Sequence, residues 1–230
     1  MRFLVLASDY DGTLAHDGRI DPATYAAIER CRASGRKVIL VTGRELDDLQ
    51  RVCQRIDLFD LVVAENGALL YFPATREERA LAPAPPSEFC EALRARGVPV
   101  SCGRVIVATW VPHEKTVLET IHQFGLELQV IFNKGAVMVL PSGVNKASGL
   151  EFALADLGLS RHEVVGVGDG ENDHAFLGHC ELSVAVADAV PSLADAADVV
   201  TRGAAGAGVV ELVEALLDDD ARRLTPRRPR

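Results

Sequence analysis

The sequence predicts an α/β protein built on a doubly wound (Rossmann-like) parallel sheet, with a small α+β cap inserted into it. Short apolar runs alternate with helical patterns at both ends of the chain, which is typical of βαβ units. Two groups of breaker residues interrupt this alternation, Pro83, Pro85 and Pro86 first and then Pro141-Ser142-Gly143. The segment between them is therefore expected to be an insertion.

The two outer parts of the chain each supply strands and helices of the expected sheet. In the first part, strands are expected at residues 3–7, 37–41 and 61–64, with helices at 22–34 and 45–55. Asp21 before Pro22 is a favoured helix start, and Ser34-Gly35 a favoured helix end. In the second part we expect, in order, a helix at 145–157, a strand at 164–167, a helix from 172, a strand at 182–186 and a helix at 209–217.

The insertion has its own pattern of elements. We expect a helix at 87–96, a strand at 104–110, a helix at 113–124, and a hairpin of 128–132 and 136–140 that turns at 133–135, giving an αβαββ cap. The chain is therefore divided into core residues 1–82, cap residues 83–141, core residues 142–217 and a charged, solvated tail at 218–230.

Charge and cysteine content limit the classes of function. The net charge of -9 and the sequence pI near 5.2 disfavour nucleic acid and anionic membranes as partners, because both would be repelled. The apolar start of the chain is too short for a signal peptide or a membrane span. Five widely spaced cysteines without a C-x-x-C pair favour reduced thiols and a cytoplasmic location. Nothing indicates the oligomeric state.

Two acids follow the first expected strand. Asp9 and Asp11 are at alternate positions where the strand ends, and the carboxyl ends of parallel strands are where ligands bind. Two carboxylates there repel each other unless a cation lies beside them, and Mg²⁺ prefers oxygen ligands. Taken alone, the pair could equally form a capped loop ending in Asp-Gly.

A hydroxyl and a lysine occur at the starts of two later helices. Thr42, Gly43 and Arg44 follow the second strand, where a hydroxyl and backbone N–H groups suit a phosphate oxygen, although Thr42 could simply cap the helix. Lys146 falls in the first turn of a helix, where the macrodipole disfavours a cation. It could extend into water, or offset charge on a phosphoryl group or a nucleophilic carboxylate.

A second acidic loop follows the strand at 164–167. Asp169 and Asp173 are expected to reach the same crevice as the first pair. The Gly-x-Gly pattern here is not a complete dinucleotide fingerprint, and three acids would repel a pyrophosphate without a metal. All four segments are expected at one edge of a single sheet, so together they indicate a site more strongly than any one of them does alone.

These segments resemble the motifs of the haloacid dehalogenase (HAD) superfamily. DYDGTL at residues 9–14 resembles its first motif, VTGR at 41–44 its second, Lys146 its third, and GDGENDH at 168–174 its fourth. The insertion, the segment at 64–68 and the GDGEND form resemble the Cof-like branch with an α/β cap. The small cap is similar to that of archaeal-type phosphoglycolate phosphatases.

The resemblance implies a role for each matching residue. Asp9 would be the nucleophile, and Asp11 the acid that protonates the leaving group and then the base that activates water. Mg²⁺ would be held by Asp9, the backbone carbonyl of Asp11 and Asp169, with Asp173 as a further or water-mediated ligand. Phosphoryl oxygens would be bound by Gly12, Thr42, Gly43, Arg44, Lys146 and Asn172. Lys146 would also offset charge near Asp9. Arg44 could instead contact substrate or form a structural ion pair.

Several other residues have two interpretations. His174 is expected on a helix surface or behind the site rather than as a ligand or proton shuttle, and His16 is expected not to reach the leaving group. Trp110 is expected in the core of the cap rather than as a substrate platform. Four cationic residues of the cap could contact a second anionic group of the substrate. They are Arg104, His113, Lys115 and Lys134.

The sequence therefore predicts a Mg²⁺-dependent phosphatase that hydrolyses a small phosphorylated metabolite through an aspartyl-phosphate on Asp9. The substrate is expected to be a sugar phosphate or a phosphoglycolate-like acid. A phosphomutase would use the same intermediate and remains the alternative. A signalling receiver also combines acids, a Thr and a Lys, but the cap and the order of Lys146 and Asp169 argue against it. A non-catalytic binding protein is disfavoured by the intact set of acids.

Overall fold

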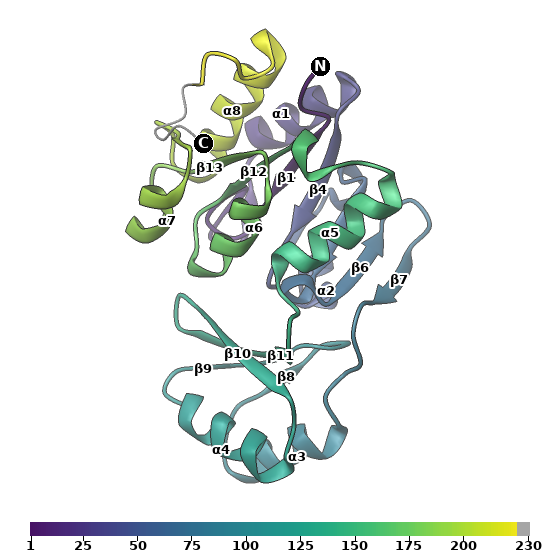
Figure 1. The fold of residues 1–230 in the computed structure, drawn as a ribbon, viewed down its shortest axis with the longest axis vertical. Coiled ribbons are helices and arrows are strands. Elements are labelled where there is room, and N and C mark those ends of the chain that lie inside the picture. Colours follow the sequence, from purple (N-terminus) through teal and green to yellow (C-terminus); the bar gives the residue numbers. More distant parts are fainter. Residues whose placement is uncertain (225–230) are drawn as a thin grey trace.

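The larger of two main sheets has eight strands, in the order β14-β13-β12-β1-β4-β5-β6-β7, in a computed structural model that describes residues 1–224 (Figure 1). The six strands from β14 to β5 are parallel, whereas β6 and β7 extend the sheet antiparallel. This confirms the predicted α/β core. In chain order the strands are β1 (Val5–Ser8), β4 (Lys37–Val41), β5 (Leu61–Ala64), β6 (Leu69–Phe72), β7 (Glu77–Ala80), β12 (Val164–Gly168), β13 (Leu182–Ala185) and β14 (Val199–Val200).

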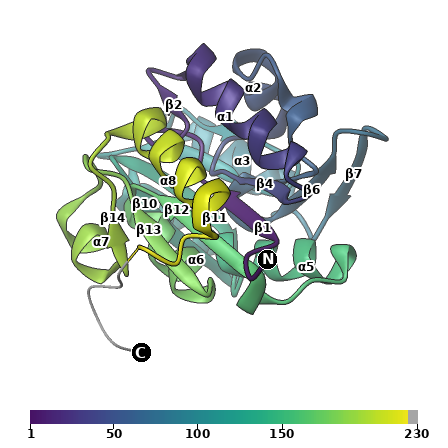
Figure 2. The ribbon, with the colours of Figure 1, turned by 90° about the horizontal axis from the view of Figure 1, so that it is seen from above.

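Helices cover both faces of this sheet, as a doubly wound fold requires (Figure 2). Strand residues alternate between the two layers: in β1, Leu6 packs on one face, whereas Val5 and Ala7 pack on the other. The first face is covered by α1 (Pro22–Ala33), α2 (Leu46–Val52) and α8 (Ala205–Asp219). The second face is covered by α5 (Lys146–Leu157), α6 (His174–His179) and α7 (Pro191–Ala196).

A smaller sheet, in the order β10-β11-β9-β8, forms the cap together with two helices. Its elements are α3 (Ser87–Ala95), β8 (Ser101–Cys102), β9 (Val107–Trp110), α4 (Glu114–Phe124), β10 (Leu128–Asn133) and β11 (Ala136–Pro141). The helices cover the face of the cap sheet that points away from the core (Figure 1). The other face is turned toward the core, so the two units can enclose a site between them. We propose residues 83–141 as the limits of the cap.

Most predicted elements are present, with shifted ends. The strand limits at 37–41 and 61–64 are confirmed, and Asp21 caps α1 by accepting a hydrogen bond from the Thr24 N–H. The predicted αβαββ order of the cap is wrong, because the short strand β8 precedes β9. The strands β6 and β7 extend the first part of the core beyond the predicted strands. Short 3-10 helices are η1 (Ile56–Leu58), η2 (Glu65–Gly67), η3 (Arg161–Glu163) and η4 (Glu171–Asp173).

Helix α8 begins at Ala205 and continues to Asp219, two residues into the segment predicted as a tail. The end of that predicted tail, 225–230, lies outside the described residues. Within residues 1–224, no helix is both long and apolar enough to cross a membrane.

The buried carboxylate of Glu65 connects the core to the cap. Its two oxygens accept hydrogen bonds from the backbone N–H groups of Arg104 at 2.8 Å, Val105 at 2.7 Å and Ile106 at 2.9 Å. These groups are therefore not free to join a sheet, which explains why β9 begins at Val107 and not at the predicted residue 104. A charged acceptor that holds three buried or half-buried donors fixes where the chain enters the cap.

Replacing Glu65 with alanine is expected to lower the free energy of unfolding by about 3 kcal/mol, because it leaves three backbone N–H groups without their acceptor. Urea unfolding of the variant measures this loss. Glu77→Ala, on the exposed strand β7, is the matched control and should change stability by less than about 0.5 kcal/mol. Equal effects of the two substitutions would contradict the proposed connection.

Candidate active site

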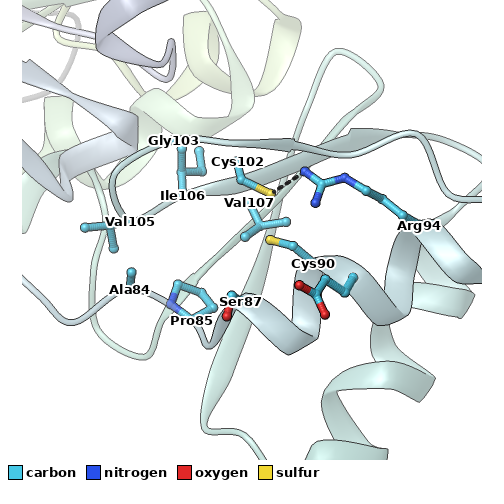
Figure 3. Close-up of a pocket in the computed structure, with 11 residues that line it drawn as sticks. Ala84, Pro85, Ser87, Cys90, Arg94, Cys102, Gly103, Val105, Ile106 and Val107 are labelled. Carbon is cyan, nitrogen blue, oxygen red and sulfur yellow. Dashed lines mark hydrogen bonds between the residues drawn. The ribbon is translucent and has the colours of Figure 1, made fainter.

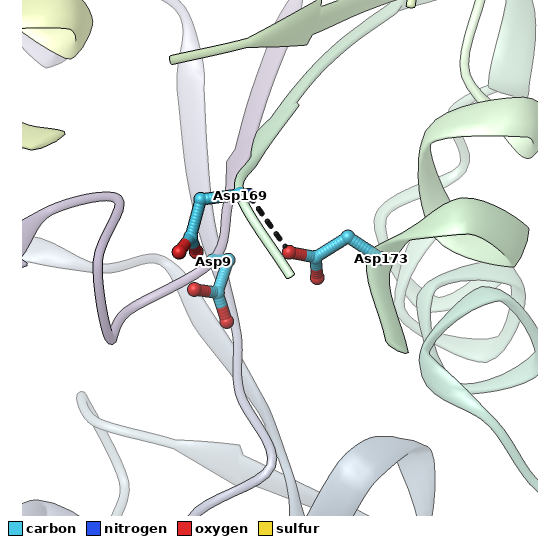
Figure 4. Close-up of side chains that lie close together, drawn as sticks. All are labelled: Asp9, Asp169 and Asp173. Carbon is cyan, nitrogen blue, oxygen red and sulfur yellow. Dashed lines mark hydrogen bonds between the residues drawn. The ribbon is translucent and has the colours of Figure 1, made fainter. Parts of the chain in front are cut away.

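Three buried aspartates meet at the carboxyl end of the central strands (Figure 4). Asp9 follows β1, Asp169 follows the neighbouring strand β12, and Asp173 ends η4. One carboxylate oxygen from each lies within 4.8 Å of the others. Parallel pairing of β1 with β12 brings the first and fourth sequence motifs together, as predicted.

A single buried lysine bridges two of these acids. Lys146 is the first residue of α5, and its Nζ lies 2.5 Å from Asp9 Oδ1 and 2.6 Å from Asp173 Oδ1. Asn145 caps the helix by accepting from the N–H groups of Ala147 and Ser148, which fixes the turn that carries the lysine. Burial would lower the pKa of Lys146, but the charges of Asp173 and Asp9 outweigh it and raise the pKa. The lysine therefore stays charged.

The acids compete for this one buried cation. Burial raises the pKa of Asp9; Lys146 opposes this shift, whereas the negative charges of Asp173 and Asp169 add to it. The net pKa of Asp9 lies well above the ordinary value. Without further positive charge, the ionised cluster therefore costs folding free energy.

Asp9→Asn is expected to stabilise the protein in EDTA, by about 1 kcal/mol near pH 8. The folded-state pKa of Asp9 is raised. The contribution of Asp9 to the free energy of unfolding is therefore most favourable below the unfolded-state pKa of about 4, and it is lost as the pH rises through the folded-state pKa. The advantage of the variant should therefore shrink as the pH falls. Urea unfolding across this pH range measures it, and an advantage that grows toward low pH would contradict the account.

Asp169 and Asp173 hold the fourth motif in place. Asp173 Oδ2 accepts from the backbone N–H groups of Asp169 and Gly170, both at 2.9 Å. Asp169 accepts from the Thr13 hydroxyl at 2.9 Å and from the Lys134 ammonium, which comes from the turn between β10 and β11. Asp173 thus positions both the loop and Lys146, and the cap contributes a cation to the cluster.

The acidic cluster suits a hard divalent cation. Carboxylate oxygens are the ligands that Mg²⁺ prefers, and three of them converge here. Gly12 keeps the adjacent space open, because a Cβ at this position would lie 2.2 Å from Asp169 Oδ2. Its φ of +85° also favours glycine. The donor set and the missing side chain together fit the metal that the sequence predicts.

The second acid of the first motif points elsewhere. The Asp11 carboxylate pairs with Arg44, with contacts of 2.6 and 2.7 Å, and Arg44 also pairs with Asp48 of α2. The Asp11 side chain is therefore outside the cluster. The ligand implied by the resemblance is its backbone carbonyl, and that role stays a prediction. Of the two alternatives for Arg44, the structure has the ion pair.

The remaining predicted phosphate-binding residues lie beside the cluster. Thr42 is buried and its Oγ1 accepts from the Arg44 N–H at 3.1 Å, which leaves the hydroxyl hydrogen free to donate. It does not cap α2, which begins at Leu46 with Glu45 as its N-cap. Gly43 lies against Asn172, whose amide donates to Asn66 Oδ1 at 2.9 Å.

A cavity of about 740 Å³ separates the cap sheet from this edge of the core. Acids, arginines and small residues line it, together with the exposed indole of Trp110. The expectation that Trp110 belongs to the cap core is therefore wrong. The lining residues are Asp9, Asp11, Gly43, Arg44, Glu45, Asp48, Arg51, Pro99, Val100, Ser101, Ala108, Thr109, Trp110, Asn133, Lys134, Ala136, Met138 and Asn172.

Of the four predicted cap cations, Lys134 alone lines the cavity. Arg104 instead pairs with Asp47 and Glu78, at the joint between cap and core. His113 precedes α4 and Lys115 lies on it, on the far side of the cap sheet. These three side chains therefore do not face a ligand in the cavity.

The two histidines near the motifs also lie apart from the cluster. His16 is exposed in the hairpin of β2 (Ala15–His16) and β3 (Arg19–Ile20), beside Asp17. His174 is on the helix surface, with its Nε2 3.1 Å from Ser192 Oγ. The surface position of His174 agrees with the position expected from the sequence, and His16 is not among the residues that line the main cavity.

A second cavity, of about 280 Å³, lies within the cap between α3 and the strands β8 and β9 (Figure 3). Cys90 and Cys102 face each other there, and Arg94 lies 3.3 Å from the Cys102 sulfur. Burial raises the pKa of the Cys90 thiol to about 12, with Cys102 adding to the shift. The five cysteines all lie within residues 1–224 and form no disulfide there, and no acid cluster lines this cavity.

Sequence reasoning did not assign Thr13, Asn133 or Trp110 to the main site. Thr13 belongs to the first motif and follows Asp11 at the same alternate spacing, so its contact with Asp169 could have been expected. Asn133 and Trp110 carry no such signal, because their place depends on how the cap is turned.

Comparisons with known proteins agree with this geometry. A family model described as haloacid dehalogenase-like hydrolase matches residues 6–104 and 105–213. A phosphoglycolate phosphatase of Methanothermobacter thermautotrophicus is 33% identical over 90% of this chain and 96% of its own, and phosphoglycolate phosphatase 2 of Saccharolobus solfataricus is 29% identical over 93% and 92%. A solved structure described as a HAD subclass IIB sugar phosphatase covers 93% of this chain and 97% of its own, with a TM-score of 0.72 and 22% identity. The chain belongs to the haloacid dehalogenase-like hydrolase family.

Proposed function

We propose that this protein is a Mg²⁺-dependent phosphatase that hydrolyses a small phosphorylated metabolite through an aspartyl-phosphate on Asp9. The observation that carries the proposal is the buried Asp9 carboxylate at the end of β1, held by Lys146 at 2.5 Å on the wall of a cavity. The phosphatase names of the two archaeal relatives support hydrolysis as the reaction class.

Asp9 and Asp11 divide the chemistry between them. An Asp9 oxygen attacks phosphorus, the bond to the leaving oxygen breaks, and protonated Asp11 gives that oxygen its proton. Water then attacks phosphorus while the Asp11 carboxylate takes a proton from it, which frees Asp9 and inorganic phosphate. Asp11 lines the cavity but pairs with Arg44, so it must leave that ion pair to reach the reacting oxygen.

The other residues orient charge and phosphoryl oxygens. Lys146 fixes one Asp9 oxygen, so the other is the one available to attack. The Thr42 hydroxyl, the Gly43 backbone and the Asn172 amide offer hydrogen-bond donors beside it. Thr42 and Asp9 follow the paired strands β4 and β1. These strands therefore do not have to move for the Thr42 hydroxyl and the Asp9 carboxylate to act on the same phosphoryl group.

Asp9, Asp169 and the backbone carbonyl of Asp11 would hold Mg²⁺, with Asp173 as a further or water-mediated ligand. When bound, the ion offsets negative charge on the transferring phosphoryl group. Lys134 of the cap also contacts the Asp169 carboxylate.

A phosphate-release screen over a panel of phosphorylated metabolites tests the proposal. Wild-type protein should release inorganic phosphate with Mg²⁺, lose the activity in EDTA, and recover it when Mg²⁺ is added back. Release that needs a bisphosphate activator would favour the phosphomutase alternative. Activity that EDTA does not affect would contradict the metal-dependent mechanism.

A further inference from the structure

Trp110 occupies an unusual place for a large aromatic side chain. It ends β9, opposite Ala136 of β11, and 61% of its surface is exposed although it lines the cavity that contains Asp9. Exposure alternates along β9: Val107 and Thr109 are buried, whereas Ala108 is half-buried and Trp110 is exposed. Ala108, Thr109 and Trp110 all line the cavity, and of these Trp110 has the large exposed side chain. The indole is thus placed on the face of the cap that meets a bound molecule.

Small side chains leave room beside this ring. Ala136 is its cross-strand neighbour, and Ala108 pairs with Ser101 on one side and Met138 on the other. Aromatic rings contribute large apolar area and favour stacked or edge contacts with other rings. A flat molecule could therefore lie against the indole without displacing a large side chain.

Charges on the cavity wall do not favour a second anionic group. On the core side the lining contains two cations, Arg44 and Arg51, and four carboxylates, those of Asp9, Asp11, Glu45 and Asp48. Both arginines are paired with Asp48, Arg51 at 2.9 Å, so Arg44 keeps an acidic partner even when Asp11 leaves it. The one lysine of the lining residues, Lys134, pairs with Asp169.

The size of the cavity also argues against a small anionic substrate. A volume of about 740 Å³ is in the range of pockets, about 300–1,000 Å³, that enclose drug-sized ligands. A two-carbon acid phosphate would leave most of it to water. Its carboxylate would also share the cavity with the acids of the core wall, which repel it.

We propose that Trp110 determines specificity by packing against an uncharged ring of the leaving group. The inference rests on the proposed phosphatase function and narrows its substrate class to phosphate esters of uncharged cyclic alcohols or phenols. Phosphoglycolate, after which the two archaeal relatives are named, is then a poor substrate for this chain.

A comparison of four esters tests the substrate class. Wild-type kcat/KM with Mg²⁺ should be at least about tenfold higher for glucose 6-phosphate or p-nitrophenyl phosphate than for phosphoglycolate. Glycerol 3-phosphate, which is uncharged but acyclic in its leaving group, should fall between them. The two ring substrates separate a sugar from an aromatic leaving group. Phosphoglycolate as the preferred ester of the four would overturn the proposal.

Variants test the role of the indole itself. Trp110→Ala should lower kcat/KM for the preferred ring substrate about tenfold, mainly by raising KM, while Trp110→Phe keeps it within about threefold. In Trp110→Ala, the ratio of kcat/KM for the ring ester to kcat/KM for glycerol 3-phosphate should also fall. Phe132 is an exposed aromatic residue of the same cap sheet, but it does not line the cavity. Phe132→Ala should therefore change neither kcat/KM nor KM.

Two further outcomes separate this inference from the proposed function. Ser101→Arg adds a cation to the same cap face and should raise the relative activity toward phosphoglycolate. An equal loss for all esters in Trp110→Ala would show a structural effect and overturn the specificity role. Failure to hydrolyse any ester, p-nitrophenyl phosphate included, would instead contradict the phosphatase function on which the inference rests.

Discussion

Replacing Asp9 with asparagine is expected to lower kcat for phosphate release by at least about a thousandfold, because the amide cannot form the phosphoryl-enzyme. The side chains have the same shape, and Lys146 keeps its contact with Asp173 at 2.6 Å. The fold should therefore survive. Phosphate release at saturating substrate, together with circular dichroism of the variant, measures the two effects separately.

Two further variants test the nucleophilic role of Asp9. Asp9→Glu keeps the charge but adds a methylene group, and a displacement of about 1 Å should still cost about a hundredfold in rate. Asp17→Asn changes a fully exposed aspartate of the β2–β3 hairpin and should leave the rate unchanged. Activity of Asp9→Asn above about a tenth of wild type would be incompatible with a nucleophilic role.

Lys146→Met should abolish turnover and lower the free energy of unfolding by about 3–5 kcal/mol, because it leaves buried carboxylates without their cation. Lys146 is 1% exposed and contacts both Asp9 and Asp173, so water cannot replace it without opening the site. Urea unfolding in EDTA gives the stability change. Lys115→Met, on the exposed surface of α4, is the control and should change stability little.

The double variant Asp9→Asn/Lys146→Met tests the cause of this loss. Removing one carboxylate together with the lysine should recover part of the stability that Lys146→Met loses, because the two residues are in direct contact. Purely additive effects, or a loss in Lys146→Met below about 1 kcal/mol, would contradict an electrostatic role for the lysine.

The local sequence predicts the core of the fold well. Strand β4 and the start of α1 depend on short-range signals, apolar β-branched residues and an Asp-Pro helix start, and both are present as predicted. Strand β7 is exposed throughout and begins with three charged residues, so its sequence has no alternating pattern. The start of β9 depends on Glu65, about forty residues earlier in the chain, and no local pattern contains that information.

The active site also has a part that the sequence predicts and a part that it does not. Parallel strands that each end in polar residues made the meeting of Asp9 with Asp169 predictable before the strand order was known. The pair of Asp11 with Arg44 depends on side-chain directions at the sheet edge, and the exposure of Trp110 depends on which face the cap turns to the core. Neither follows from spacing along the chain.

Rapid-quench analysis of Asp11→Asn with p-nitrophenyl phosphate tests the covalent mechanism most directly. Nitrophenolate leaves without a proton, so Asp9 can be phosphorylated, whereas attack by water lacks its base. We expect a burst of one nitrophenolate per protein molecule and a phosphoryl group on the peptide that contains Asp9. A burst without this phosphopeptide, or a phosphoryl group on another residue, would contradict the assignment of Asp9 as the nucleophile.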